Sequence, residues 1–392
     1  MKTKNLKNNL WKLYLHEAFA GMFFSVPVIV LFWQNNGLSL TEVMILQSLF
    51  AIMAMILEIP TGYFSDIYGR KKTLVMAGIC FFLGISTYSV SHNFQQFLIA
   101  EAFFALGVAL YSGTLSAFVY DTLQDLHQEK CYKKIWGNVL FSGMMALAIS
   151  NILGGFIAAI DLRYTLYASI PFFALLIPLT LSMHEPKKHK SPTEKGAPKK
   201  LQTILKEVLQ NKKLQWLIVF SGVIFAFNQS ALWLYQPYFK LSGLDVIYFG
   251  LVFASFQIMA AFSSKYAHKI EAKIGQKHSL IMLIFLLAGS YFLMSHFVFL
   301  FSFSFCFLQQ FIRGFKEAVV TDYINALTTS NQRATILSAE SFVGRLLYAM
   351  LLPLIGWIAN LYTLPQTLLL LAGTSLVCGG VILIGLRKVR VI

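Results

Sequence analysis

The stretch Gly62-Tyr-Phe-Ser-Asp66-Ile-Tyr-Gly69-Arg70-Lys71-Lys72 lies between two long apolar runs. A connection that only joins two helices needs no particular sequence, whereas this one combines two glycines, an aspartate and three consecutive basic residues. Gly62 has no side chain, so another helix can approach its backbone. Asp66 can accept hydrogen bonds at a helix N-terminus, Gly69 permits a tight turn, and Arg70 offers a planar fork of donors to a carboxylate.

The composition is that of an integral membrane protein. Of 392 residues, 57% are hydrophobic and 12% are charged, so a water-soluble fold would lack the polar surface to cover itself. A spanning helix needs about 20 apolar residues, and the chain has room for roughly twelve. We expect spans near residues 10–33, 40–61, 73–91, 95–119, 136–158, 163–183, 214–238, 246–264, 278–295, 297–320, 334–358 and 362–386.

The basic residues follow membrane topology. A net charge of +15 could indicate nucleic-acid binding, but the lysines and arginines are too unevenly distributed for that function. They gather at residues 2–12, 70–72, 130–134, 187–213 and 265–277, whereas the opposite loops carry only Arg163 and Lys240. This is the positive-inside bias, and it predicts that both termini are cytoplasmic. We expect a lipid bilayer and a small-molecule substrate as partners, no nucleic acid, and a monomer.

The middle of the chain is a polar linker. The apolar pattern stops from about residue 185 to residue 213, which predicts an N-terminal six-helix bundle over 1–184, a cytoplasmic linker over 185–213 and a C-terminal six-helix bundle over 214–392. Apolar residues share one helical face over 201–209, so this part is expected to lie at the membrane interface. A disordered basic tether is the alternative.

The two halves show weak internal repetition. Gly113 precedes Asp121 by eight residues, and Gly314 precedes Asp322 by the same interval. Gly69 has a counterpart in Gly275. Both offsets are close to two hundred residues, with the linker between them, which predicts a duplicated transporter architecture.

The opening stretch resembles the signature loop of the major facilitator superfamily, G-x-x-x-D-x-x-G-R-K/R, between helices 2 and 3. The resemblance implies an all-α fold of twelve spanning helices in two pseudo-symmetric six-helix bundles. It also implies a cytoplasmic gate of Asp66, Arg70, Asp121 and Arg333, which holds the halves together when the protein is open to the outside and breaks when it opens inward. A simpler interpretation is that the basic residues only enforce topology, but it leaves Gly62, Asp66 and Gly69 unexplained.

Within that superfamily, three segments are similar to bacterial drug exporters of the drug/proton antiporter type. They are Glu58-Ile-Pro-Thr-Gly62, Ser112-Gly-Thr114 and Arg333-Ala-Thr-Ile-Leu-Ser338. The chain departs from the exporter pattern at Ser150-Asn151, where a Gly-Pro pair is expected before Gly154-Gly155.

Ionisable residues inside the bilayer are costly and often functional. Glu17 and Glu101 are the predicted proton-coupling acids, because burial favours a neutral carboxyl group that can bind and release a proton. Arg345 lies near the bilayer centre and is assigned to coupling or substrate binding together with Glu340. Those two residues are five apart, about 140° around a helix, so a mutual pair is not expected. Permanently protonated, structural glutamates are the alternative.

Two further groups complete the candidate site. Arg313 and Glu317 are four residues apart on one helix, which predicts a structural ion pair. The wall of the central cavity is expected to include the polar and aromatic residues of the span 214–238, namely Asn228, Gln229, Trp233 and Tyr235.

The expected activity is secondary active transport by alternating access. No Gly-x-x-x-x-Gly-Lys-Ser/Thr loop is present in the sequence, so an ion gradient or the substrate itself must supply the driving force. Proton-coupled export of a small amphipathic molecule across the cytoplasmic membrane of a bacterium is the leading hypothesis. Uptake or facilitated transport of a nutrient, metabolite or lipid-like solute is the alternative, and a non-transporting receptor or scaffold is the other class. We expect no enzyme activity, no metal and no cofactor.

Overall fold

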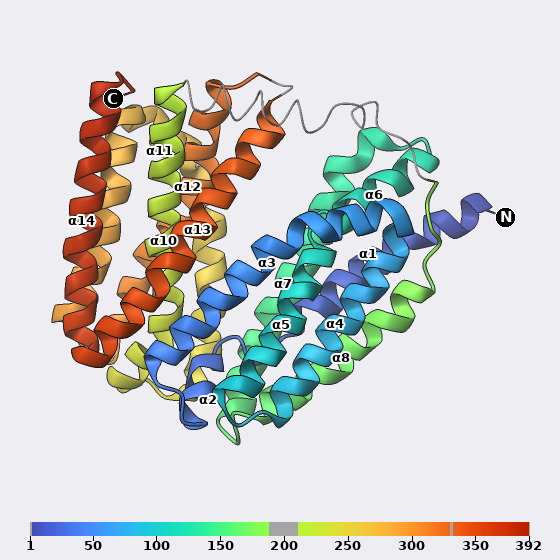
Figure 1. Cartoon of the computed structure of the whole chain (residues 1–392), viewed down its shortest axis with the longest axis horizontal. Helices are drawn as coiled ribbons and strands as arrows, with labels where there is room; N and C mark the ends of the chain where they lie inside the picture. Colours follow the sequence, from blue (N-terminus) through green and yellow to red (C-terminus); the bar gives the residue numbers. More distant parts are fainter. Residues whose placement is uncertain (1, 188–210, 330–331, 392) are drawn as a thin grey trace. The chain divides into compact units, whose positions relative to one another are not determined.

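A computed structural model describes residues 2–187, 211–329 and 332–391, and the regular structure of these residues is helical (Figure 1). The predicted interfacial helix at 201–209 lies outside the described residues. The helices are α1 (Lys2–Gly21), α2 (Ile29–Asn35), α3 (Leu40–Tyr68), α4 (Arg70–Val90), α5 (Phe94–Tyr111), α6 (Thr114–Asp125), η1 (Glu129–Cys131), α7 (Tyr132–Ala158), α8 (Tyr164–Leu181), α10 (Lys212–Leu241), α11 (Val246–His296), η3 (Ser302–Phe305), α12 (Cys306–Ala326), α13 (Arg333–Leu361) and α14 (Leu364–Lys388).

Two compact units make up the chain. Unit 1 comprises Met1–Leu38, Leu49–Ser191 and Val246–Ala254, and unit 2 comprises Ser39–Ser48, Pro192–Asp245 and Ser255–Ile392. Most of α3 therefore belongs to unit 1 and most of α11 to unit 2. The predicted three-part division at residues 184 and 213 stays a prediction.

Nine helices of the described chain are long and apolar enough to cross a membrane. They are α3, α4, α7, α8, α10, α11, α13 and α14, together with α5 and α6, which count as one candidate span. Neither α1 nor α12 is among them, because α1 begins in a lysine-rich segment and α12 carries several charged residues. Composition therefore identifies fewer spans than the twelve predicted.

Several predicted spans differ from the observed helices at glycine and proline positions. The span predicted over 10–33 is interrupted at residues 22–28, which contain Pro27, a residue with no N–H to donate. The span predicted over 95–119 is broken at Gly113, whose φ is 63°, a backbone conformation that glycine adopts readily. The spans predicted over 246–264 and 278–295 form one long helical run, interrupted only at Gly275 with φ 76°. The span predicted over 297–320 begins late, since α12 starts at Cys306.

Unit 1 is built around α4 and α1. Helix α4 packs against α5 and α8, and helix α1 packs against α7 (Figure 1). At the crossing of α1 and α7, a Cβ atom on Gly21 would lie 2.5 Å from the carbonyl oxygen of Gly143. Small residues allow such close approach of two helices in a membrane.

Unit 2 contains a matching crossing. Helix α10 packs against α12, α13 and α14, and a Cβ atom on Gly222 would lie 3.4 Å from the Cα atom of Gly344 on α13. Gly21 and Gly222 are 201 residues apart, and so are Gly143 and Gly344. A close helix crossing thus recurs in each unit at the spacing of the sequence repeat.

Candidate functional site

The signature stretch forms a polar cluster around Arg70 in unit 1. Gly69 has φ 98° and separates α3 from α4, so Arg70 opens α4. One terminal nitrogen of its guanidinium donates to the Asp66 carboxylate at 3.1 Å and to the Ser65 hydroxyl at 3.1 Å. Its Nε donates to the carboxylate of Asp121 on α6 at 3.4 Å. Three of the four predicted gate residues therefore lie together.

A carboxylate from the end of the first half completes this cluster. The two oxygens of Glu185 accept hydrogen bonds from the backbone N–H groups of Arg70 and Lys71, each at 2.8 Å. The first N–H groups of a helix have no partner within it, and the helix dipole favours an anion there. Sequence reasoning missed this cap. In the sequence, this cap was indicated only by an acidic residue directly before Pro186, just after a predicted membrane helix.

The remaining gate residues are placed differently. Arg333 is the first residue of α13 and belongs to unit 2, so its predicted contact with the cluster stays a prediction. No described atom outside the helix's own backbone lies within 4 Å of the position that a Cβ atom would take on Gly62. The close helix approach that we expected there stays a prediction.

Glu17 lies at the junction of three helices in unit 1. The hydroxyl group of Tyr111, the last residue of α5, donates a hydrogen bond to its carboxylate. A Cβ atom on Gly143 of α7 would lie 2.6 Å from the other carboxylate oxygen. The ring of His16 stacks on the ring of Tyr111 with 5.6 Å between centroids. No ion pair between Glu17 and a basic side chain is recorded within the described chain.

Glu101 is buried inside an aromatic cluster. Its side chain accepts a hydrogen bond from the Tyr88 hydroxyl group at 2.5 Å, and it is 5% exposed. The ring of Tyr88 packs against Trp33, Phe97 and Phe104. This glutamate therefore lies in a tightly packed, largely apolar environment.

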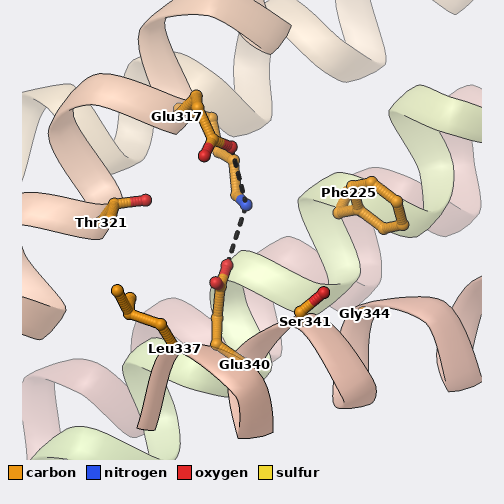
Figure 2. Close-up of a pocket in the computed structure, with 8 residues that line it drawn as sticks. Phe225, Glu317, Thr321, Leu337, Glu340, Ser341 and Gly344 are labelled. Atoms are coloured by element: carbon orange, nitrogen blue, oxygen red, sulfur yellow. Dashed lines mark hydrogen bonds and ion pairs between the residues drawn. The ribbon is translucent and has the colours of Figure 1, made fainter. Parts of the chain in front are cut away.

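Unit 2 contains a cavity of ≈ 250 Å³ lined by charged and polar side chains (Figure 2). Lys316 on α12 and Glu340 on α13 form an ion pair across it, with 2.9 Å between Nζ and Oε1. Only 9% of the lysine side chain and 12% of the glutamate side chain are exposed. The remaining lining residues are Phe225, Glu317, Thr321, Leu337, Ser341 and Gly344.

Other contacts orient this ion pair. The Ser221 hydroxyl group on α10 donates to the same oxygen of Glu340. The Lys316 ammonium group lies 5.8 Å from the centre of the Phe225 ring and 3.9 Å from the Glu317 carboxylate. The dashed lines of Figure 2 mark its ion pairs with Glu340 and Glu317. Glu340 was a predicted site residue, but its partner Lys316 was not. A lysine inside the span predicted over 297–320 was the available signal.

The predicted ion pair between Arg313 and Glu317 is wrong for this structure. Arg313 donates instead to the Gln257 side chain on α11 at 2.7 Å, and 76% of the Glu317 side chain is exposed. A partner on the neighbouring helix α11 therefore binds the guanidinium. Arg345 lies on α13 and is half-buried.

Three of the four residues predicted to line the central cavity contact other helices of unit 2. Asn228 donates to the backbone and side-chain oxygens of Gln309 at 2.8 and 2.7 Å. Trp233 donates to the Tyr348 hydroxyl group at 2.6 Å, and the buried Tyr235 accepts from Gln310 at 3.2 Å. Gln229 is half-buried. None of the four lines the cavity at Lys316, and their exposure to a central cavity stays a prediction.

Comparison with known sequences identifies one family. The profile of the Major Facilitator Superfamily matches residues 17–349. The quinolone resistance protein NorA of Staphylococcus aureus is 22% identical over 232 residues, which are 59% of this chain and 54% of NorA. An uncharacterized MFS-type transporter, MJ1560 of Methanocaldococcus jannaschii, is 29% identical over 116 residues, which are 29% of this chain and 28% of that protein. Each match covers less than two thirds of the relative.

Solved structures agree on the fold. The crystal structure of the nucleoside transporter NupG matches with a TM-score of 0.81 and 14% identity, covering 98% of this chain and 99% of NupG. A bacterial homolog of the human lysosomal transporter Spinster, in an inward-facing and unoccupied conformation, matches with a TM-score of 0.71 and 14% identity, covering 99% of this chain and 96% of that one.

Proposed function

Because the chain belongs to the major facilitator superfamily, we propose that it exports a small amphipathic molecule in exchange for protons by alternating access. The site of action is the cytoplasmic membrane of a bacterium, with both chain termini in the cytoplasm. The match to NorA, whose name describes quinolone resistance, supports export as the direction.

We infer twelve spanning helices, and the observed elements support this number. Nine candidate spans are apolar enough by composition. Helix α11 counts once among the nine, but its break at Gly275 gives it two spans. We assign one further span to α1 with α2 and the last to α12. The matched crossings at Gly21 and Gly222, which are 201 residues apart, support an arrangement as two six-helix bundles.

The hydrogen bond from Tyr111 to Glu17 is the observation that carries the coupling proposal. It joins a membrane-embedded acid on α1 to the last residue of α5, immediately before the helix break at Gly113. A carboxylate accepts such a bond more strongly than a neutral carboxyl group does. Protonation of Glu17 therefore weakens a contact at a point where the backbone already departs from helical geometry. Glu101 is a second candidate carrier, with Arg345 assisting in one conformation.

Reconstituted protein tests this function. A thermal-shift screen that begins with the quinolone norfloxacin identifies a substrate. Proteoliposomes with an imposed pH gradient should then accumulate it. Glu17→Gln should abolish accumulation but leave substrate exchange intact, because exchange needs no net proton movement. Glu129→Gln, which removes an acid from η1, is the matched control and should behave as wild type.

Three outcomes would contradict the proposal. If Glu17→Gln, Glu101→Gln and the double variant all retain gradient-driven accumulation, neither acid couples transport to protons. If wild-type protein equilibrates substrate without responding to the gradient, facilitated transport of a nutrient or metabolite replaces export. A protein that binds but never moves substrate would belong to the receptor class.

A further inference from the structure

The cavity of unit 2 holds a cation and an anion that are each other's principal partners. Lys316 is 7% exposed and contacts Glu340 at 2.9 Å. Glu340 receives one further hydrogen bond, from the fully buried Ser221. Both charged groups border a volume of ≈ 250 Å³, so a ligand that enters this volume meets both of them at once.

A ligand with a single charge is poorly matched to this pair. An anion that takes Lys316 leaves the Glu340 carboxylate with the Ser221 hydroxyl group alone. A cation that takes Glu340 leaves Lys316 with Glu317, its neighbour in sequence, and adjacent helical residues do not face each other. Removing one member of a buried ion pair is strongly unfavourable, because the other charge is left uncompensated. A monovalent ligand therefore exchanges one good ion pair for another and strands a charge.

A ligand that carries both charges avoids this cost. Its carboxylate can pair with Lys316 while its ammonium group pairs with Glu340, so one ion pair is replaced by two and no charge is stranded. Hydroxyl groups of Thr321 and Ser341 border the same volume and can accept or donate hydrogen bonds around the two charges.

The size and apolar wall of the cavity limit the ligand further. Pockets for drug-sized ligands have volumes of about 300–1,000 Å³, so a cavity of ≈ 250 Å³ takes the charged end of a molecule or a small metabolite. The Phe225 ring lies beside the ammonium group of Lys316 and, with Leu337, offers an apolar surface for the adjoining part of the ligand.

We propose that Lys316 and Glu340 bind the zwitterionic head of the transported molecule, which separates them and takes their ion pair apart. Lys316 holds the carboxylate of the ligand, Glu340 holds its ammonium group, and Phe225 packs against its body. This inference rests on the proposed function, because it names the class of molecule that the proposed transporter binds in unit 2.

Binding to the purified full-length protein tests the assignment directly. Matched triplets share one aromatic body and differ only in charge. One triplet is phenylalanine, phenethylamine and 3-phenylpropanoate, and another is tryptophan, tryptamine and indole-3-propanoate. Isothermal titration should give affinities for the zwitterions at least tenfold higher than for either singly charged analogue.

Substitutions assign the two charges. Glu340→Gln should remove the contribution of the ammonium group, so that the zwitterion binds no better than its carboxylate analogue. Lys316→Met should do the same for the carboxylate. Because a single substitution leaves a buried charge and can impair folding, the double variant Lys316→Met/Glu340→Gln is the second test. It removes both charges together and should show no preference within a triplet. Lys240→Met, at the end of α10, is the charge-removal control and should keep the preference.

Three results would overturn the assignment. They are equal or tighter binding of the amines, which indicates a site for cations; no measurable binding of any zwitterion at millimolar concentration; and an unchanged preference in the double variant. These titrations use no proton gradient and do not involve Glu17. Their failure would therefore leave the coupling test intact, and a failure of coupling would leave the binding result intact.

Discussion

Tyr111 donates a hydrogen bond to the carboxylate of Glu17 and is itself the last residue of α5, so that an acid on α1 is linked directly to a break in the helix. The break arises at Gly113, whose φ of 63° ends α5 and lets α6 begin at Thr114. Under the proposed coupling, protonation of Glu17 is expected to change the alignment of α5 and α6.

Removal of the hydroxyl group from Tyr111 should weaken coupling and leave the fold intact. Tyr111→Phe keeps the ring that stacks on His16 but removes the donor to Glu17. Hydrogen bonds to charged groups contribute about 1.5–3 kcal/mol, so we expect gradient-driven accumulation to slow about tenfold or more, while substrate exchange continues. Initial rates in proteoliposomes measure this. Equal loss of accumulation and exchange would indicate a structural role instead.

Two glycines on α7 should respond differently to the same substitution. A Cβ atom on Gly143 would meet the movable carboxylate of Glu17, whereas a Cβ atom on Gly154 would collide with the backbone oxygen of Phe24. Gly154→Ala should therefore destabilise the protein by about 1–3 kcal/mol, as overpacking does. Gly143→Ala should unfold near the wild-type temperature but lose gradient-driven accumulation. Thermal unfolding and transport assays on the pair check this, and identical behaviour of the two variants would argue against it.

The cap on α4 should contribute measurably to stability. Glu185→Gln leaves one acceptor in place of two and removes the negative charge at the helix N-terminus. Losing a cap costs about 1 kcal/mol, and the charge-dependent part should shrink in high salt. A lower unfolding temperature than that of the Glu129→Gln control, with a smaller difference at high salt, is the expected result. Equal unfolding temperatures would show that the two hydrogen bonds are dispensable.

The gate assignment predicts a change of conformational population. Asp66→Asn preserves shape but weakens the charge-assisted contact with Arg70 at 3.1 Å. If the cluster stabilises the outward-open state, the population should shift inward, and spin-label distances between the cytoplasmic ends of α3 and α13 should lengthen. Lys72→Gln removes a charge from the first turn of α4 and serves as the control. Unchanged distance distributions in folded Asp66→Asn protein would count against the gate.

Local sequence rules and the signature motif anticipated the contacts around the turn between α3 and α4 better than those elsewhere. The turn at Gly69 follows from local chemistry, whereas the grouping of Asp66, Arg70 and Asp121 on α3, α4 and α6 was implied by the resemblance to the superfamily. The ion pair of Lys316 with Glu340 joins different helices, and no spacing in the sequence encodes which faces of those helices meet. The i,i+4 rule paired Arg313 with Glu317 because it considers only one helix, whereas Gln257 of α11 offers a closer acceptor.

The helix breaks were missed for a related reason. Hydropathy continues across residues 22–28 and across Gly113, so an apolar pattern predicts one span where the backbone forms two segments. The positive φ of Gly113 and the position of Pro27 were visible only as single residues, whose effect depends on tertiary packing.

Recording the pH inside proteoliposomes during substrate movement tests the central claim most directly. Vesicles that contain the dye pyranine are mixed with the substrate from the thermal-shift screen, norfloxacin being the first candidate, and protein-free vesicles correct for its buffering. For wild-type protein, inward flux of substrate should drive protons out and raise the internal pH. Glu17→Gln, in vesicles preloaded with unlabelled substrate, should exchange it for labelled external substrate without this change. Substrate flux through wild-type protein with no change of internal pH, or the same pH change in Glu17→Gln, would contradict proton exchange through this residue.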